Sequence, residues 1–425
     1  MKKLLVYFIL CFFVISCKER ESSVAIMESV FYTDSIISLK MDSVMVEDTA
    51  YLSDIVEDIK YINLDISNTE HFFQLQYTDS FIVANNSDSL FLFNHKGRKT
   101  KSISLHFGCF DVSEQQDSIY TYTFQNKRLS CYDFKGNQIW THRLHYKDKE
   151  VGSYGYFFAQ INDSLFAIAI QNQGFNPDQL IVVNKCGYVK KQVSNKETFP
   201  YPGVRYTAHT DWYRTLTIND GQVLYHPAYG DTVYTIGGDM QLIPYLVEEI
   251  VKKVPLEDRP EYTGNNWKQF DAVCMKNMIY VTRIFNTLRY AIVEYKIGSI
   301  NQHMSNYWVY DKKERTLKKT FNNISESLKK GIAHFGIFND YDGGLAFAPD
   351  FNSNEYLIMV NAGKLQGNKT VYAKQIYLSN LPTMKNKYNY RSDIFQDSIM
   401  KRKADAFWFN CDEKKLTLTV VKMKK

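Results

Sequence analysis

The densest group of side chains that could hold a ligand lies between Thr198 and Arg214, where aromatic residues alternate with hydrogen-bonding ones. Aromatic faces beside polar groups suit sugar rings or a peptide, and ligand clefts are commonly lined in this way. The same side chains could instead pack between neighbouring strands as a plain connection. As a binding surface, this stretch offers Arg205, Tyr206, His209, Trp212 and Arg214.

A second candidate for chemistry is the polar turn Asn339-Asp340-Tyr341-Asp342-Gly343-Gly344. Carboxylates at Asp340 and Asp342, next to glycines that allow a sharp turn, could bind calcium. No Glu follows at the distance that an EF-hand requires, and Asp and Gly are also the residues that any tight turn prefers. These two residues are therefore weak metal candidates, and no motif indicates a cofactor or a catalytic residue.

The charge pattern argues against a nucleic-acid partner. The chain has 51 basic and 46 acidic residues, a net charge of +5, and the basic residues are dispersed along it. A nucleic-acid-binding surface would require them to be concentrated on one face or segment. Aromatic residues make up 15% of the chain, a composition that favours β-strands.

The N-terminus predicts export and a lipid anchor. Lys2 and Lys3 precede a short apolar run that ends in Val14-Ile15-Ser16-Cys17, which is similar to the lipobox of bacterial lipoproteins. We expect residues 1–16 to be the signal peptide, and 17–48 to be the lipidated Cys17 with its tether. An outer-membrane lipoprotein would follow, on the cell surface or the periplasmic face. The alternative is an ordinary signal peptide with an incidental cysteine.

The elements that would position any site are repeated hairpins. Leu129 to Trp140 reads as two strands around a turn opened by Asp133, and the same plan recurs with Asn94, Asn184 and Asp311 in the matching places. A short strand precedes each hairpin, at Asp79–Val83, Asp117–Tyr122, Asp163–Ala167 and Asn277–Val281. This rhythm predicts an all-β fold over residues 49–425: a six-bladed β-propeller with four-stranded antiparallel blades.

Further elements are expected near the two ends of the chain. A first strand is predicted around Ile36–Leu39, a surface helix over Ser392–Arg402 and a final strand over Lys415–Lys422. Between Pro244 and Asp258 a short helix is possible, although the β-branched residues favour a strand. The two chain ends should complete one blade together, which would close the ring and protect its edges.

Three short motifs resemble a known family. Leu52 to Leu64, Gly230-Asp231-Thr232-Val233-Tyr234 and Asn339 to Gly344 are similar to the opening, middle and late motifs of the six-bladed β-propeller lipoproteins of Bacteroidetes. Those proteins resemble NHL and TolB-like propellers, and most have no assigned function. This chain departs from them at Phe107–Phe110 and at Asp405–Cys411, where a Gly-Pro-rich turn and an Asn-Pro pair are usual.

Two classes of function fit these observations. The first is a lipid-anchored binding or scaffolding module of the cell envelope, which contacts the membrane through Cys17 and holds a glycan, a peptide or an envelope protein. The alternative is a carbohydrate-active enzyme, a glycoside hydrolase or lyase, on a propeller scaffold. The linear sequence does not show which carboxylates would face one another, so it does not separate the two.

Overall fold

The computed structural model describes the chain in segments: residues 36–39, 50–67, 69–146, 157–170, 177–195, 216–219, 222–227, 230–248, 279–297, 306–319, 336–337, 339–340, 347–360 and 399–425. Ile37–Lys425 form one compact unit, described here by itself, and of the other unit, Met1–Ile36, only Ile36 is described. Within these segments, no helix is long and apolar enough to cross a membrane.

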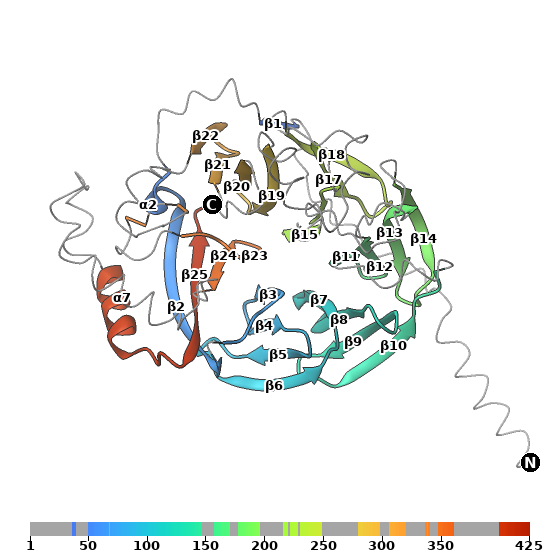
Figure 1. The fold of residues 1–425 in the computed structure, drawn as a ribbon, viewed down its shortest axis with the longest axis horizontal. Coiled ribbons are helices and arrows are strands. Elements are labelled where there is room, and N and C mark those ends of the chain that lie inside the picture. Colours follow the sequence, from blue (N-terminus) through green and yellow to red (C-terminus); the bar gives the residue numbers. More distant parts are fainter. Residues whose placement is uncertain are drawn as a thin grey trace, which may run out of the picture. The chain divides into compact units, whose positions relative to one another are not determined.

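The compact unit is a six-bladed β-propeller, as predicted, with its blades arranged around a common axis (Figure 1). Blade 1 comprises β3 (Gln74–Tyr77), β4 (Ile82–Asn85), β5 (Ser89–Phe93) and β6 (Lys99–Ser104). Blade 2 comprises β7 (Gly108–Ser113), β8 (Ser118–Thr123), β9 (Arg128–Asp133) and β10 (Gln138–Arg143). Blade 3 comprises β11 (Phe157–Asn162), β12 (Leu165–Ala169), β13 (Asp178–Asn184) and β14 (Val189–Ser194).

Blades 4 to 6 complete the ring. Blade 4 comprises β15 (Leu216–Asn219), β16 (Gln222–Tyr225), β17 (Thr232–Ile236) and β18 (Leu242–Glu248). Blade 5 comprises β19 (Ile279–Asn286), β20 (Tyr290–Ile297), β21 (Asn306–Asp311) and β22 (Thr316–Lys319). Blade 6 comprises β23 (Phe351–Ser353), β24 (Tyr356–Val360), β25 (Lys415–Met423) and, outermost, β2 (Val56–Ser67).

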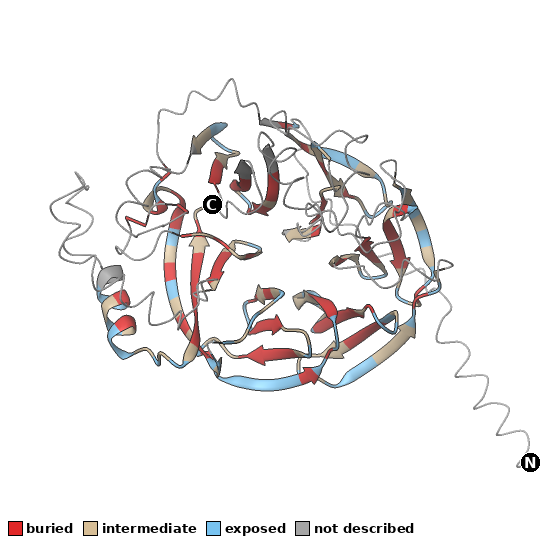
Figure 2. Ribbon diagram, viewed as in Figure 1, coloured by how far each residue is buried: buried red, intermediate tan, exposed pale blue. Residues whose placement is uncertain are grey.

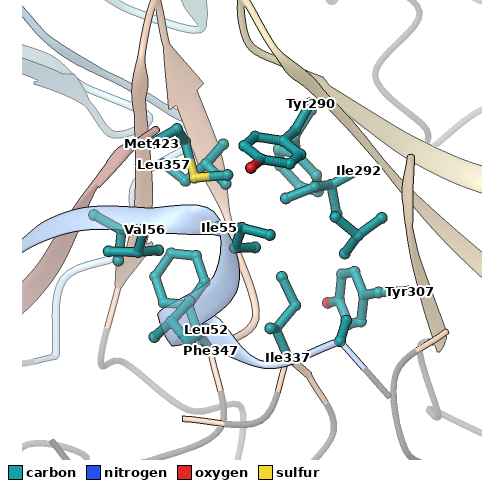
Figure 3. Packing of buried hydrophobic residues seen from close by; sticks show 14 of the residues in the cluster. Leu52, Ile55, Val56, Tyr290, Ile292, Tyr307, Ile337, Phe347, Leu357 and Met423 are labelled. Carbon is teal, nitrogen blue, oxygen red and sulfur yellow. The ribbon is translucent and has the colours of Figure 1, made fainter. Parts of the chain in front are cut away.

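Blade 6 confirms that the two ends of the chain close the ring together. β2, from the start of the unit, pairs antiparallel with β25, from its end. The short helix α2 (Leu52–Ile55) precedes β2, and its buried Leu52 and Ile55 pack with Tyr290 of blade 5 and Met423 of β25 (Figure 3). One apolar cluster therefore holds the N-terminal and C-terminal segments against blade 5.

Burial decreases from the middle strands of a blade to its outermost strand (Figure 2). Every residue of β4 is buried, whereas β6 buries only Ile103. The buried side chains of one blade pack against those of the next, as where Leu90 and Leu92 meet Phe110 and Ile119. The core is thus a series of interfaces between sheets, so each blade depends on its neighbours.

The repeated hairpin turns lie where the sequence predicts, between the third and fourth strands of blades 1, 2, 3 and 5. Asn94, Asp133, Asn184 and Asp311 each open the turn, and the side-chain Oδ1 of each accepts hydrogen bonds from backbone N–H groups two to four residues later. Gly97 adopts a φ of 80°, and a Cβ there would lie 2.1 Å from the carbonyl oxygen of Asn63 in blade 6. Only glycine allows this turn to dock on the neighbouring blade.

A fifth strand joins blade 4. The predicted strand near the N-terminus is β1 (Ile37–Leu39), which pairs in parallel with Leu246–Glu248 of β18. Ile37 is buried in the cluster that contains Leu246. Pro244 lies within β18, so the segment from Pro244 to Glu248 is strand rather than helix.

The leading strand predicted at Asn277–Val281 is described from Ile279 as β19, the first strand of blade 5. The predicted C-terminal helix differs from the structure. The predicted helix was expected to end at Arg402, but α7 (Ile399–Asn410) continues to Asn410. It continues because Ala404 and Trp408 are buried against Tyr61 of β2. The final strand is confirmed as β25.

Candidate functional site

A buried carboxylate joins the first strands of blades 1, 2 and 3. Asp111, on β7, is only 2% exposed. Its Oδ2 accepts a hydrogen bond from the backbone N–H of Gln160 on β11 at 2.6 Å. Its Oδ1 accepts one from Nε2 of Gln76 on β3 at 3.0 Å and one from the backbone N–H of Val112 at 2.8 Å. One side chain therefore ties three blades together near the axis of the ring.

Within the described part of the chain, the hydrogen-bond partners of the Asp111 carboxylate are three neutral N–H donors. Burial raises the pKa of its carboxyl to about 6, although the three N–H donors oppose this by favouring the charged form. The group therefore changes its charge close to neutral pH. Because it is so deeply buried and its oxygens are occupied, its role in this position is to hold the inner strands in place.

Blades 4 to 6 are tied by a neutral side chain instead. Nδ2 of Asn352, on β23 of blade 6, donates to the carbonyl oxygen of Ile218 on β15 at 3.1 Å and to that of Asn286 on β19 at 3.3 Å. Ser353 Oγ, the next residue, donates to the carbonyl oxygen of Tyr77 in blade 1 at 2.7 Å. The first strand of blade 6 is therefore bonded by side chains to three other blades.

An ion pair in blade 5 also contacts blade 6. Nε of Arg283, on β19, lies 2.7 Å from Oε2 of Glu294 on β20, whose side chain is 3% exposed. Nη1 of Arg283 donates to the carbonyl oxygen of Asp350, just before β23, at 3.1 Å. Burial lowers the pKa of Arg283, but the charges of Glu294 and Asp350 outweigh it, so the pKa is raised. Through Arg283, this ion pair of blade 5 is linked to blade 6.

Two exposed phenylalanines directly precede the first strands of blades 1 and 2. Phe73 precedes β3 and is 56% exposed, and Phe107 precedes β7 and is 51% exposed. Their backbone N–H groups donate to the carbonyl oxygens of Asn85 and Ser87, so they flank the turn between β4 and β5. They bring two apolar surfaces to one end of blades 1 and 2.

The residue that sets this arrangement is Asn85, which is fully buried. Its Oδ1 accepts a hydrogen bond from the N–H of Gln74 at 2.9 Å, and its Nδ2 donates to the carbonyl oxygen of Gly108 at 2.7 Å. It therefore joins the residues that directly follow Phe73 and Phe107. A rigid backbone beneath exposed aromatic side chains lowers the entropy cost of binding a ligand.

The polar turn shows a structural contact. Asp340 is buried, and its carboxylate accepts hydrogen bonds from the N–H and Oγ of Ser53, at the start of α2. Asp342 lies outside the described residues, so calcium binding by this turn stays a prediction. The other sequence-predicted positions, Cys17 and Arg205, Tyr206, His209, Trp212 and Arg214, also lie outside the described part of the chain.

Two surface features were not predicted from the sequence. Phe73 and Phe107 are single residues before strands, and only the fold shows that they share one end of the molecule. The run Lys96-Gly97-Arg98-Lys99-Thr100-Lys101 has four cations in six residues. The basic residues are dispersed over the chain as a whole, but the density of charge in this short window distinguishes it.

This cationic run borders a surface hollow of about 470 Å³, lined by Asn94, His95, Lys96 and Arg98. His95 is held in place at its edge. Its ring stacks on Tyr77 with centroids 4.8 Å apart, and its Nε2 lies 2.8 Å from the carbonyl oxygen of Thr78. A carbonyl only accepts, so Nε2 carries the hydrogen. The hollow therefore has one fixed imidazole and two exposed cationic side chains.

Among solved structures, the chain is similar to a Bacteroides fragilis protein described as exported, with a TM-score of 0.59 and 13% identity over 92% of this chain and 100% of that one. It is also similar to a member of the DUF4221 family from Bacteroides vulgatus, with a TM-score of 0.44 and 12% identity over 87% of this chain and 98% of that one. At these identities the first likeness shows the fold alone. No curated protein matches the chain.

A family model gives the assignment. The model of DUF4934, a domain of unknown function, matches residues 36–390, which begin at the border of β1 and extend beyond β24. The six blades confirm the expected propeller fold, while the lipoprotein character and the likeness to NHL and TolB-like propellers stay predictions. Because the match covers most of the sequence, the chain belongs to the DUF4934 family.

Proposed function

We propose that this propeller is a lipid-anchored module of the cell envelope that binds a glycan, a peptide or a protein partner, and that does not itself catalyse a reaction. The observation that carries the proposal is the exposed pair Phe73 and Phe107, held in place by Asn85. Aromatic faces of this kind stack on sugar rings and on apolar side chains. The side-chain ties between blades supply a frame that needs no reorganisation when a ligand binds.

Two buried acids favour binding over the enzymatic alternative. Asp111 accepts three hydrogen bonds, and Glu294 is paired with Arg283. A glycoside hydrolase or lyase requires carboxyl groups that can reach the substrate. These two carboxyl groups are instead committed to holding strands together.

The anchor in this proposal is Cys17, with residues 1–16 as the cleaved signal and an outer-membrane location on the cell surface or the periplasmic face. The solved relative that is described as exported supports export of this chain as well. Mass spectrometry of the mature N-terminus in the native host tests the anchor. We expect an acylated Cys17 and, in a Cys17→Ser variant, an unprocessed or soluble protein; an unmodified mature N-terminus at another residue would refute the anchor.

The stretch that contains Arg205, Tyr206, His209, Trp212 and Arg214 remains a proposed contributor to ligand contact, and Asp340 with Asp342 remains a proposed weak calcium site. A thermal-shift screen with envelope glycans, peptides and calcium tests both. Calcium should raise the melting temperature, and a chelator should reverse the rise, only if the polar turn binds the ion. A ligand at about 100 times its Kd stabilises a fold by about 2.7 kcal/mol, which such a screen detects.

The aromatic pair is tested by substitution against any ligand from that screen. We expect the double variant Phe73→Ala with Phe107→Asn to weaken binding at least tenfold, since each exposed ring would lose its stacking surface. Asn is chosen because Phe107 has a φ of 43°, a region that Asn tolerates. Phe409→Ala is the control, because Phe409 is 60% exposed on α7. Equal affinity of the two variants would remove the pair from the binding surface.

A further inference from the structure

The strongest charged feature of the described surface lies on blade 1. Lys96, Arg98, Lys99 and Lys101 are all exposed, at the turn between β5 and β6 and along β6 itself. We call these four residues the blade 1 basic strip. None of them forms an ion pair with a residue that the structure describes. The strip is therefore an uncompensated positive surface on the outermost strand of the blade.

Two of these side chains have fixed stems. The ammonium group of Lys99 lies 5.7 Å from the centroid of the Phe91 ring. The methylene groups of Lys101 lie against the turn of blade 2. A Cβ on Gly136 in that turn would lie 2.8 Å from Cγ of Lys101. The exposed Lys135 is adjacent to that glycine. Lys135 adds a further cation at the blade 2 turn, where it interacts with the carboxylate of Asp133.

The corresponding turn of blade 5 shows that a propeller turn does not require this charge. There Asp311 and Glu314 lie 2.7 and 3.8 Å from Nη2 of Arg289, and Lys318 pairs with Asp54 at 3.1 Å. Acidic partners are therefore mixed among the cations of blade 5. Both turns are opened by a side chain that accepts hydrogen bonds from backbone N–H groups, Asn94 in blade 1 and Asp311 in blade 5, but they present different charge to a partner.

We propose that the blade 1 basic strip docks the propeller onto phosphate headgroups of an anionic membrane surface, with the hollow beside His95 receiving a headgroup. This inference rests on the proposed lipid anchor, which would keep the protein beside a membrane. Each Lys or Arg near an anionic bilayer contributes about 1 kcal/mol, which is about fivefold in affinity. A fully extended segment of about 19 residues, the number between Cys17 and β1, spans at most roughly 65 Å at roughly 3.5 Å per residue, so a lipid anchor by itself would not fix the orientation.

Co-sedimentation with vesicles tests the docking on a chain that begins at residue 18, which lacks any acyl group and contains the whole compact unit. The vesicles are phosphatidylcholine alone, or phosphatidylcholine with about one third phosphatidylglycerol. We expect binding to the anionic vesicles only, and loss of that binding as salt increases. Equal binding to both compositions, or binding to neither, overturns the proposal.

A matched pair of variants places the effect on the strip. Lys99→Gln with Lys101→Gln should weaken binding to the anionic vesicles by roughly 25-fold, from two cations at about fivefold each. Lys313→Gln with Arg315→Gln removes the same charge from two exposed residues of the blade 5 turn, and should change binding by less than about threefold. Equal losses in the two variants would mean that net charge, and not the strip, controls binding.

Inorganic phosphate separates a membrane headgroup from a free anion. At constant ionic strength, phosphate should neither raise the melting temperature nor displace the vesicles at about 1 mM. A phosphate-dependent rise without vesicle binding would replace membrane docking by a small-anion site. Vesicle binding in this unacylated chain, together with an unacylated Cys17 in the host, would support the strip and refute the anchor, so the two failures are distinct.

Discussion

Two carboxylates are equally buried in this propeller and are stabilised in opposite ways. Asp111 in blade 2 and Glu294 in blade 5 are both 2% exposed. Asp111 has three neutral N–H donors, and burial raises its pKa to about 6. Glu294 has the guanidinium of Arg283 at 2.7 Å, and the pKa of that arginine is raised. One side of the ring therefore contains a carboxyl that titrates, and the other contains an ion pair.

Inner strands can therefore be joined in two ways that both keep the tight packing of the blades. Neutral donors can join three strands through one small side chain, but they compensate the buried charge incompletely. An arginine compensates the charge more fully, although its own long side chain must then be desolvated. We expect the two sides of the ring to respond differently to mutation and to pH.

The largest effect should come from breaking the ion pair. Glu294→Ala removes the nearer of the two acids that face Arg283, and removing one member of a buried pair costs about 3 kcal/mol or more. We expect a loss of about 3 kcal/mol in the free energy of unfolding, measured by urea denaturation, because Arg283 is 26% exposed and water can partly replace the carboxylate. A loss below about 1 kcal/mol would show that the pair is not needed. Glu294→Gln is the control, since it retains a hydrogen-bond acceptor and should cost less.

Titration of Asp111 should have the next largest effect. Its folded pKa of about 6 lies above the ordinary value of 3.8, so its contribution is fully present below about pH 4 and is lost as the pH rises through 6. A shift of about two pKa units corresponds to about 3 kcal/mol. The free energy of unfolding of the natural protein, minus that of Asp111→Asn, should therefore fall by about 3 kcal/mol from about pH 4 to about pH 7.

The free energy of unfolding of Asp111→Asn is subtracted because other carboxyl groups change the stability in the opposite direction as the pH changes. Hydrogen bonds from the backbone and side chain of Asn137 lower the pKa of Asp133, and hydrogen bonds from Arg289 lower that of Asp311 against its burial. Their contributions are lost on acidification and cancel in the difference between the two proteins. A difference that does not change with pH would show that Asp111 does not titrate in this range.

The neutral tie should produce the smallest effect. Asn352→Ala leaves the carbonyl oxygens of Ile218 and Asn286 without this donor and should cost about 1 kcal/mol, independently of pH between 4 and 7. Asn352→Asp sharpens the comparison, because it places a carboxylate against two carbonyl oxygens. Its cost should exceed that of the alanine variant at neutral pH and decrease on acidification. If both variants lose the same free energy at every pH, Asn352 contributes only packing.

Local chemistry made much of the fold predictable. Asn94, Asp133, Asn184 and Asp311 form their turns with hydrogen bonds that reach no more than four residues along the chain, so the short-range pattern sufficed to place four hairpins. The final strand was equally clear from its alternation. The order of strands within blade 5 was not predicted, because it depends on the pairing of β19 with β20, which no local signal specifies.

The inner ties could not be predicted, because their partners are far apart in sequence. Asp111 and Gln160 lie 49 residues apart, and Asn352 and Ile218 lie 134 residues apart. An isolated Asp or Asn within a strand gives no sign of a partner at such a distance. The end of α7 was missed for the same reason, since Trp408 remains helical through its contact with Tyr61 of β2. The predicted ligand residues Arg205 to Arg214 stay untested.

The strand β1 also determines how the protein would carry mechanical load. A force applied through residues that precede Ile37 reaches the β1 and β18 pairing first, and only after that pairing opens does it reach β2, which closes the ring. Opening of the β1 and β18 pairing in blade 4 would thus shield the β2 and β25 pairing of blade 6 from the applied force. The propeller could be pulled by its N-terminal end and lose three paired residues while its closure with β25 remained intact.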